Sequence, residues 1–215
     1  MKAGYYNHSI GDLKRRLSAA VPHEVLKELH RKEPVRHFAV VLRQAFLFAG
    51  AFAAGWTVES LWVRVPAAVV LGFCVFDGTV LLHEVVHKAV FRTERPLAYR
   101  FLELLYALPS GISPTQFTRW HLDHHAELGS SVDDPKRAHL SPKRNSRWLK
   151  LLYATPALFP IYFRAARTET ETYPAPVRRT IAVERLAATA LHLGVAAGIV
   201  VFGGWGGWRL ARVPG

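Results

Sequence analysis

Cysteine is nearly absent from this chain, and Cys74 is the only one in 215 residues. A single cysteine excludes an intrachain disulfide and a metal cluster built from several thiolates. The first 37 residues are polar and contain no early apolar run of the kind that a secretory signal requires. Internal repeats and low-complexity tracts are also missing. The sequence therefore does not resemble a disulfide-stabilised secreted domain or a repeat protein.

Acidic residues are also few. The chain contains 28 lysines and arginines against 16 aspartates and glutamates, which gives a formal net charge of +12. Nucleic-acid binding is one possible reason, but the basic residues flank long apolar runs and form no stripe with interleaved aromatics. Basic residues beside apolar runs are typical of the cytoplasmic flanks of membrane spans. We therefore expect a membrane protein with no nucleic-acid partner.

Apolar residues make up 50% of the chain and are concentrated in a few runs. Three of these runs are close to the roughly 20 residues that an α-helix needs to cross a bilayer: Phe38 to Trp56, Val65 to Leu82 and Leu186 to Trp205. The fold class predicted from this pattern is an all-α integral membrane protein. The chain is long enough for one domain, so we expect a polar cytoplasmic segment at 1–37 and a single membrane domain at 38–215.

Two further segments are expected to lie at the membrane interface. Leu97 to Leu108 has the pattern of an amphipathic interfacial helix. Trp148 to Phe163 is short and contains two prolines, and a crossing there would place several arginines outside. We interpret it as a re-entrant or interfacial segment. With a cytoplasmic start, the first run crosses outward and the second returns, which places His83 at the cytoplasmic end of the second span.

Histidines form two tight groups, His83-Glu84-Val85-Val86-His87 and His121-Leu122-Asp123-His124-His125. On a helix, residues three and four apart share a face, so each group would present its imidazoles together. Neutral imidazole nitrogens are good ligands for transition metals. The sequence thus predicts a metal site. Of the other histidines, we expect His139 to be solvated, His192 to be packed or hydrogen-bonded within a span, and the four in the polar leader to be exposed: His8, His23, His30 and His37.

The first group also matches the H-E-x-x-H pattern of zinc proteases, in which the glutamate is the general base. That interpretation would make Glu84 catalytic, and it needs a third ligand from another segment. Asp77 is a carboxylate available within the second span. The match is short, however, and it leaves the three histidines of the second group without a role.

Taken together, the two groups point to another family. Trp120 to His125, followed by Asp133-Asp134-Pro135, closely resembles the second histidine box of membrane fatty acid desaturases. His83 to His87 resembles their first box, H-x-x-x-H. The resemblance implies a non-haem di-iron centre that uses dioxygen, with the boxes facing the cytoplasm. Its implied metal ligands are His83, His87, His121, His124 and His125. It further implies an acyl lipid substrate and an electron donor such as a ferredoxin or a cytochrome with its reductase.

Carboxylates beside these histidines are candidates for orienting the imidazoles through hydrogen bonds: Glu84, Asp123, Asp133 and Asp134. Asp133 and Asp134 precede a proline and could equally form a turn or a helix cap. Trp120 and Asp77 are candidates for lining a substrate channel, although packing is an equal alternative for Trp120. Asp77 lies six residues before His83, about 9 Å away along a helix, so we expect it to pair with another buried polar group.

The third histidine box of the family, H-x-x-H-H, has no counterpart in this sequence. We therefore expect the chain to be a truncated desaturase that is catalytically incomplete alone. Three alternatives stay open: a lipid or carotenoid hydroxylase or ketolase with the same boxes, an intramembrane zinc protease, and a non-catalytic membrane remnant or partner protein.

Overall fold

A computed structural model of the chain describes residues 10–140, 146–151, 155 and 157–203. In that part of the chain the secondary structure is helical throughout, without strands, which confirms the predicted all-α class. The elements in chain order are α2 (Gly11–Ala20), α3 (His23–Leu29), α4 (Pro34–Thr57), α5 (Leu61–Val86), α6 (Pro96–Ala107), η1 (Leu108–Ser110), α7 (Pro114–Ala126), η2 (Lys136–Leu140), α8 (Arg147–Leu151), α9 (Leu158–Glu171) and α10 (Ala175–Gly203).

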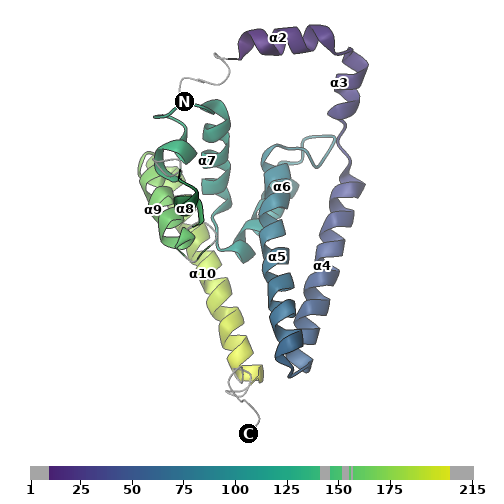
Figure 1. Cartoon of the computed structure of the whole chain (residues 1–215), viewed down its shortest axis with the longest axis vertical. Helices are drawn as coiled ribbons and strands as arrows, with labels where there is room; N and C mark the ends of the chain where they lie inside the picture. The colour runs from purple at the N-terminus through teal and green to yellow at the C-terminus, as the bar shows by residue number, and fades with distance from the viewer. Residues whose placement is uncertain (1–9, 141–145, 152–154, 156, 204–215) are drawn as a thin grey trace. The chain divides into compact units, whose positions relative to one another are not determined.

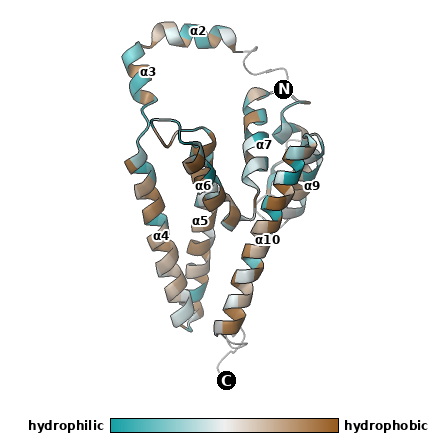
Figure 2. Ribbon diagram, turned by 180° about the vertical axis from the view of Figure 1, so that it is seen from behind, coloured by the Kyte–Doolittle hydropathy of each residue, from teal (hydrophilic) through white to brown (hydrophobic). Residues whose placement is uncertain are grey.

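Three helical stretches are long and apolar enough to cross a membrane: His23–Thr57, Leu61–Val86 and Ala175–Val201. They contain the first two predicted spans and most of the described part of the third, and Figure 2 shows apolar residues along α4, α5 and α10. Trp205, the end of the third predicted span, lies outside the described residues. The helices extend past the apolar runs because the backbone hydrogen bonds of a helix continue through polar residues. As a result His83 lies within α5 instead of after it.

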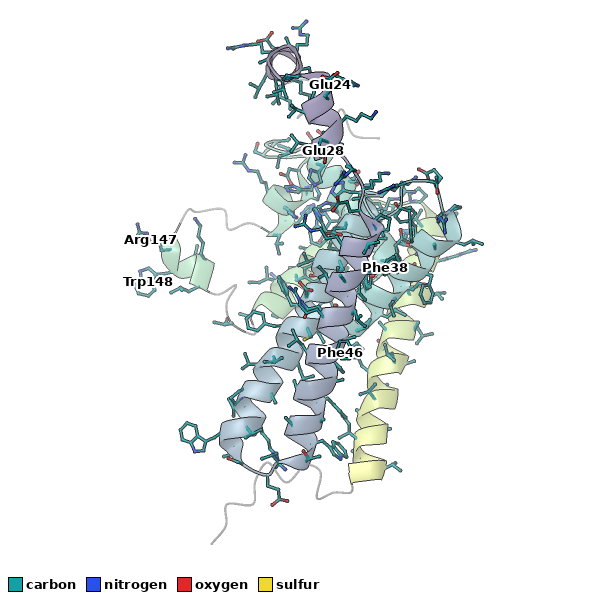
Figure 3. The ribbon with its side chains drawn as sticks, turned by 90° about the vertical axis from the view of Figure 1, so that its right-hand side faces the viewer. Glu24, Glu28, Phe38, Phe46, Arg147 and Trp148 are labelled. Carbon is teal, nitrogen blue, oxygen red and sulfur yellow. The ribbon has the colours of Figure 1, made fainter. Side chains whose placement is uncertain are left out.

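The described chain divides into two compact units, residues 1–31 with 115–181 and residues 32–114 with 182–215. In the second unit α4 and α5 lie side by side and are joined by a turn at 58–60 (Figure 1). The α6 helix, which was predicted as Leu97 to Leu108, packs against α5. Large apolar side chains stay exposed on the outer faces of these helices, including Phe46, which is 70% exposed on α4 (Figure 3). Exposed apolar faces of this kind suit a lipid environment.

Gly78 allows the close approach of α6 to α5. A Cβ atom placed there would lie 3.1 Å from the backbone oxygen of Tyr106, which is tighter than ordinary van der Waals contact. Just beyond α6, the Ser110 hydroxyl donates a hydrogen bond to the Val75 carbonyl oxygen at 3.0 Å. The absence of a side chain at Gly78 therefore permits the close approach of the two helices at this point.

The carboxyl-terminal helix α10 is held to α6 and to the loop after it by polar contacts within the second unit. The buried Glu184 carboxylate accepts hydrogen bonds from the Arg100 guanidinium and from the Ser113 hydroxyl. About two turns further along α10, His192 Nε2 lies 3.1 Å from the Pro109 carbonyl oxygen and Nδ1 lies 2.7 Å from that of Ala188. The expectation that His192 is hydrogen-bonded agrees with these contacts.

The first unit contains α7, which carries the second histidine group, and α9. The Trp120 ring stacks on Tyr162 at 5.4 Å between centroids, and both residues pack against Ala165 and Ala166. The Gln116 amide donates hydrogen bonds to the Ala166 carbonyl oxygen and to the Thr170 hydroxyl, both at 2.8 Å. A small core and two hydrogen bonds, one buried and one partly buried, thus join α7 to α9.

The predicted interfacial segment Trp148 to Phe163 is described only in part, because residues 152–154 and 156 lie outside the described residues. Its described parts form most of α8 and the start of α9. Pro160 is in the first turn of α9, where a missing N–H costs the helix no bond. Neither helix is among the three stretches that could cross a membrane. Trp148 on α8 is 79% exposed (Figure 3).

Replacing Gly78 with valine should lower the stability of the protein by about 1–3 kcal/mol, because the new side chain would meet the α6 backbone. Thermal unfolding of the purified protein in detergent would measure this. Gly72→Val is the matched control, since a Cβ on this residue of the same helix would meet no atom within 4 Å. Equal melting temperatures for the two variants would contradict the close approach at Gly78.

Candidate metal centre

The first histidine pair lies at the end of α5, in the second unit. His83 is in the last turn and His87 is the residue that ends the helix. The two ring centroids are 4.6 Å apart, and one ring nitrogen from each residue lies within 4.8 Å of the other. Both residues are exposed. The predicted i, i+4 pair therefore forms, and its nitrogens are close enough to approach one metal ion.

The end of α5 is closed by a Schellman motif directly after His87. The Ala89 amide donates to the Glu84 carbonyl oxygen and the Lys88 amide donates to that of Val85, both at 2.9 Å. Lys88 has a φ of 52°, in the left-handed region that usually requires glycine. Two backbone bonds therefore fix the turn of chain that carries the pair.

Glu84, the residue next to His83, is bound by a histidine from another helix. His37 Nδ1 on α4 lies 2.7 Å from Glu84 Oε2, and His37 Nε2 lies 3.0 Å from the Tyr106 hydroxyl on α6. His37 is only 5% exposed, so the prediction that it is an exposed leader histidine was wrong. His37 lies in the first turn of the apolar helix α4 instead of in a polar leader, and residues of α5 and α6 contact it. Burial and the nearby Glu84 carboxylate raise the pKa of Tyr106 to about 12.

The second histidine group lies on α7, in the first unit, as its spacing predicts. Nε2 of His121 and Nε2 of His125 are 3.0 Å apart. Two nitrogens this close need a proton or a cation between them, because two lone pairs repel. Two ligand nitrogens that each lie about 2.1 Å from one metal ion, at right angles to each other, are about 3.0 Å apart. The donor chemistry and spacing of this pair therefore fit a metal ion. Phe117 stacks on His121 with an interplanar angle of 4°.

His124 is oriented by a carboxylate. Its Nδ1 lies 2.7 Å from Oδ1 of Asp134, a fully buried residue. The same oxygen accepts hydrogen bonds from the amides of Lys136 and Arg137 at the start of η2. Asp134 thus serves both roles that the sequence left open, as a cap and as a partner of an imidazole. With the proton held on Nδ1, the lone pair of His124 Nε2 is available to a metal.

The remaining candidates occupy different positions. Asp133 accepts a hydrogen bond from the Ser130 hydroxyl at 3.2 Å, within the turn before η2. Asp123 and the buried Glu169 lie near Tyr173, whose pKa is raised first by burial and then by these two carboxylates. Trp120 is 5% exposed and packs in the core of its unit. Asp77 has a buried oxygen, Oδ2, without a hydrogen-bond partner among the described residues, so the expected pairing is not seen for that oxygen.

One further histidine contact had no signal in the sequence. His139, on the π-helical turn η2, has Nε2 3.5 Å from Oε2 of Glu169 on α9. His139 was predicted to be solvated, and its side chain is 31% exposed beside a carboxylate that is 2% exposed. Like His37 with Glu84, it pairs with an acid far away in the chain, a relation that local spacing cannot reveal.

Comparison with known proteins points to the same family as the pattern of the two histidine groups. The family model described as fatty acid desaturase matches residues 60–213, more than half of the chain and the whole of both groups. This chain belongs to the fatty acid desaturase family. With three helical stretches able to cross a bilayer, it is a membrane protein, and the family generally implies iron.

Curated relatives are sphingolipid desaturases. The chain is 31% identical over 148 residues to the sphingolipid delta(4)-desaturase/C4-monooxygenase DES2 of Homo sapiens, covering 64% of this chain and 45% of the relative. The Bos taurus protein of the same name is 30% identical, with the same coverage. The human sphingolipid delta(4)-desaturase DES1 is 27% identical over 60% of this chain and 40% of its own length. The chain thus spans less than half the length of these relatives. No solved structure matches it.

Asp134→Ala should destabilise the protein by about 1–3 kcal/mol, because it removes a cap and leaves the His124 N–H without its partner. Asp134→Asn keeps an acceptor oxygen for the η2 amides and should lose less. Thermal unfolding of the metal-free protein would measure both changes. Asp133→Ala, at the exposed neighbouring position, is the control. If it costs as much as Asp134→Ala, the turn as a whole and not the Asp134 contact determines stability.

Proposed function

We propose that this chain carries the histidine-box centre of a membrane desaturase, which removes two hydrogens from the acyl chain of a lipid in a dioxygen-dependent reaction. The observation that carries the proposal is the second box on α7. There His121 and His125 have their Nε2 atoms 3.0 Å apart, and His124 is oriented by a buried carboxylate. Membership of the desaturase family supports the same assignment.

The proposed ligands are the five histidines of the two boxes: His83, His87, His121, His124 and His125. The first box supplies two imidazoles and the second supplies three, and the proposed centre holds two irons. Iron held by imidazoles supplies the reaction of dioxygen with an unactivated C–H bond, which protein side chains cannot perform. We assign the conversion of a saturated to an unsaturated acyl chain to this centre.

The chain's own residues orient and isolate the ligands. Asp134 holds the proton of His124 on Nδ1, which selects the tautomer with a free Nε2. Phe117 stacks on His121 and limits rotation of that ring. Glu84 Oε2 accepts a hydrogen bond from the buried His37, so this oxygen is directed toward α4. These contacts support a histidine-ligated centre over the protease alternative.

The overall reaction needs an electron donor. Formation of one double bond removes two hydrogens from the acyl chain, and reduction of dioxygen to two waters uses these together with two further electrons and two protons. We propose a ferredoxin, or a cytochrome with its reductase, as their source. The boxes are proposed to face the cytoplasm, where such donors are found and where the positively charged flanks of the spans belong.

A sphingolipid is the proposed substrate class, because the curated relatives are named as sphingolipid delta(4)-desaturases. Hydroxylation is a second candidate. One relative is named both as a desaturase and as a C4-monooxygenase, and insertion of one oxygen atom begins with attack on the same kind of C–H bond. Lipid products with two hydrogens fewer would indicate desaturation, and products with one more oxygen atom would indicate hydroxylation.

Loss of the second-box pair should remove metal. The full chain, purified in detergent and incubated anaerobically with Fe²⁺, is expected to retain iron, whereas the double variant His121→Ala/His125→Ala should retain less than half as much, because the nitrogens 3.0 Å apart are gone. Metal analysis after desalting measures this. His30→Ala, at an exposed histidine outside the boxes, is the control and should bind iron normally.

Equal iron in the wild-type chain and the double variant would contradict the proposed ligand set. Retention of one zinc and no iron would favour the protease alternative instead. A wild-type chain that binds neither metal would indicate the non-catalytic alternative.

A further inference from the structure

A polar network, buried at His37 and Tyr106 and half exposed at Glu84, joins the first histidine box to the two neighbouring helices of the second unit. His37 of α4 lies at its centre, with Glu84 of α5 on one ring nitrogen and the Tyr106 hydroxyl of α6 on the other. Glu84 can only accept, so His37 Nδ1 carries the proton. Nε2 of the neutral ring then accepts the hydrogen bond from the Tyr106 O–H. The three side chains therefore form a directed chain that ends one residue from His83.

The cost of this network argues that it has a function. His37 is 5% exposed and Tyr106 is also 5% exposed, so an imidazole and a phenol have been removed from water. Apolar side chains of similar size would pack three helices at least as well. What a polar network adds is direction, because a hydrogen bond fixes where the Glu84 carboxylate points, which apolar contacts do not.

The network acts on the same turn that the Schellman motif closes. The Glu84 carbonyl oxygen accepts the Ala89 amide, while its side chain is bound by His37. The backbone carbonyl and the side chain of Glu84 are therefore both hydrogen-bonded, and Glu84 lies between the two histidines of the first box in the sequence. Movement of Glu84 would rotate the last turn of α5 and change the spacing of the His83 and His87 rings, now 4.6 Å between centroids.

We infer that His37 is a positioning residue of the metal centre, acting through Glu84 and assisted by Tyr106. This inference rests on the proposed function, since it assumes that His83 and His87 bind metal. His37 itself is not a ligand, because both of its nitrogens are used within the network. Loss of a contact that orients metal ligands typically weakens metal affinity by about 10- to 100-fold.

The test compares His37→Phe, which keeps an aromatic ring in the buried space, with His37→Gln. A glutamine carboxamide can donate to Glu84 and accept from Tyr106, so it should restore the network. The control is Gln44→Leu, which removes a polar contact between the same two helices, the 3.6 Å hydrogen bond from the Cys74 thiol, away from the box. All proteins are the full chain in detergent, and the probe is Co²⁺ alone, whose visible spectrum reports ligand geometry.

His37→Phe should weaken Co²⁺ binding about 10-fold or more and alter the spectrum, whereas His37→Gln and Gln44→Leu should resemble the wild type. Combining His37→Phe with Glu84→Gln should add little to either change, because the two residues act in one chain of contacts. Wild-type affinity and spectrum in His37→Phe would overturn the inference. An equal loss in Gln44→Leu would also overturn it, by assigning the effect to general helix packing.

A second measurement needs no metal. Hydrogen exchange of the metal-free protein reports the backbone of the α5 end, at residues 83–90, and His37→Phe should speed exchange there while His37→Gln does not. If wild-type protein binds no Co²⁺ yet His37→Phe still speeds this exchange, the proposed metal function fails and with it the role of His37 at a metal centre. If wild-type protein binds Co²⁺ and His37→Phe changes neither measurement, only the inference about His37 fails.

Discussion

Burial of polar groups in an apolar protein is the constraint on which this structure depends. Long helices rich in valine, leucine, alanine and phenylalanine offer few partners to an imidazole or a carboxylate, and an unpaired buried charge is costly. The structure meets this constraint by pairing acids with bases across helices. Asp134 is paired with His124, Glu169 with His139 and Glu184 with Arg100. Each pair joins two separate segments of its unit, and the Asp134 pair directly contacts a histidine of the second group.

Pairing of this kind also orders the ligands. An imidazole that donates from one nitrogen to a carboxylate is fixed in both tautomer and direction, which suits it to bind metal through the other nitrogen. His124 has this arrangement directly. In the first box the control is indirect, because the buried His37 binds Glu84 and thereby fixes the turn on which His83 and His87 stand. The two boxes therefore reach ordered imidazoles by different routes.

The family and the local contacts together explain why one short motif is misleading. H-E-x-x-H in a zinc protease leaves the glutamate facing the metal-bound water, whereas here Glu84 is engaged by His37. A five-residue pattern records only which residues share a helical face. It does not record which neighbour in space competes for the glutamate, and that neighbour lies 47 residues away in the chain.

Sequence alone was sufficient for the all-α membrane class, for the helices bearing both histidine groups and for the desaturase family, because helical periodicity, apolar length and motif spacing are local properties. For Asp134 the sequence left two alternatives, a helix cap or a hydrogen-bond partner of an imidazole, and the structure shows that Asp134 does both. Tertiary structure decided the rest: that His37 is buried instead of exposed, that His139 meets Glu169, and that Gly78 on α5 permits the close approach of the α6 backbone at Tyr106. These relations depend on contacts between separate helices, and the energy of a buried hydrogen bond or a close backbone approach depends on positions in space that no local pattern encodes.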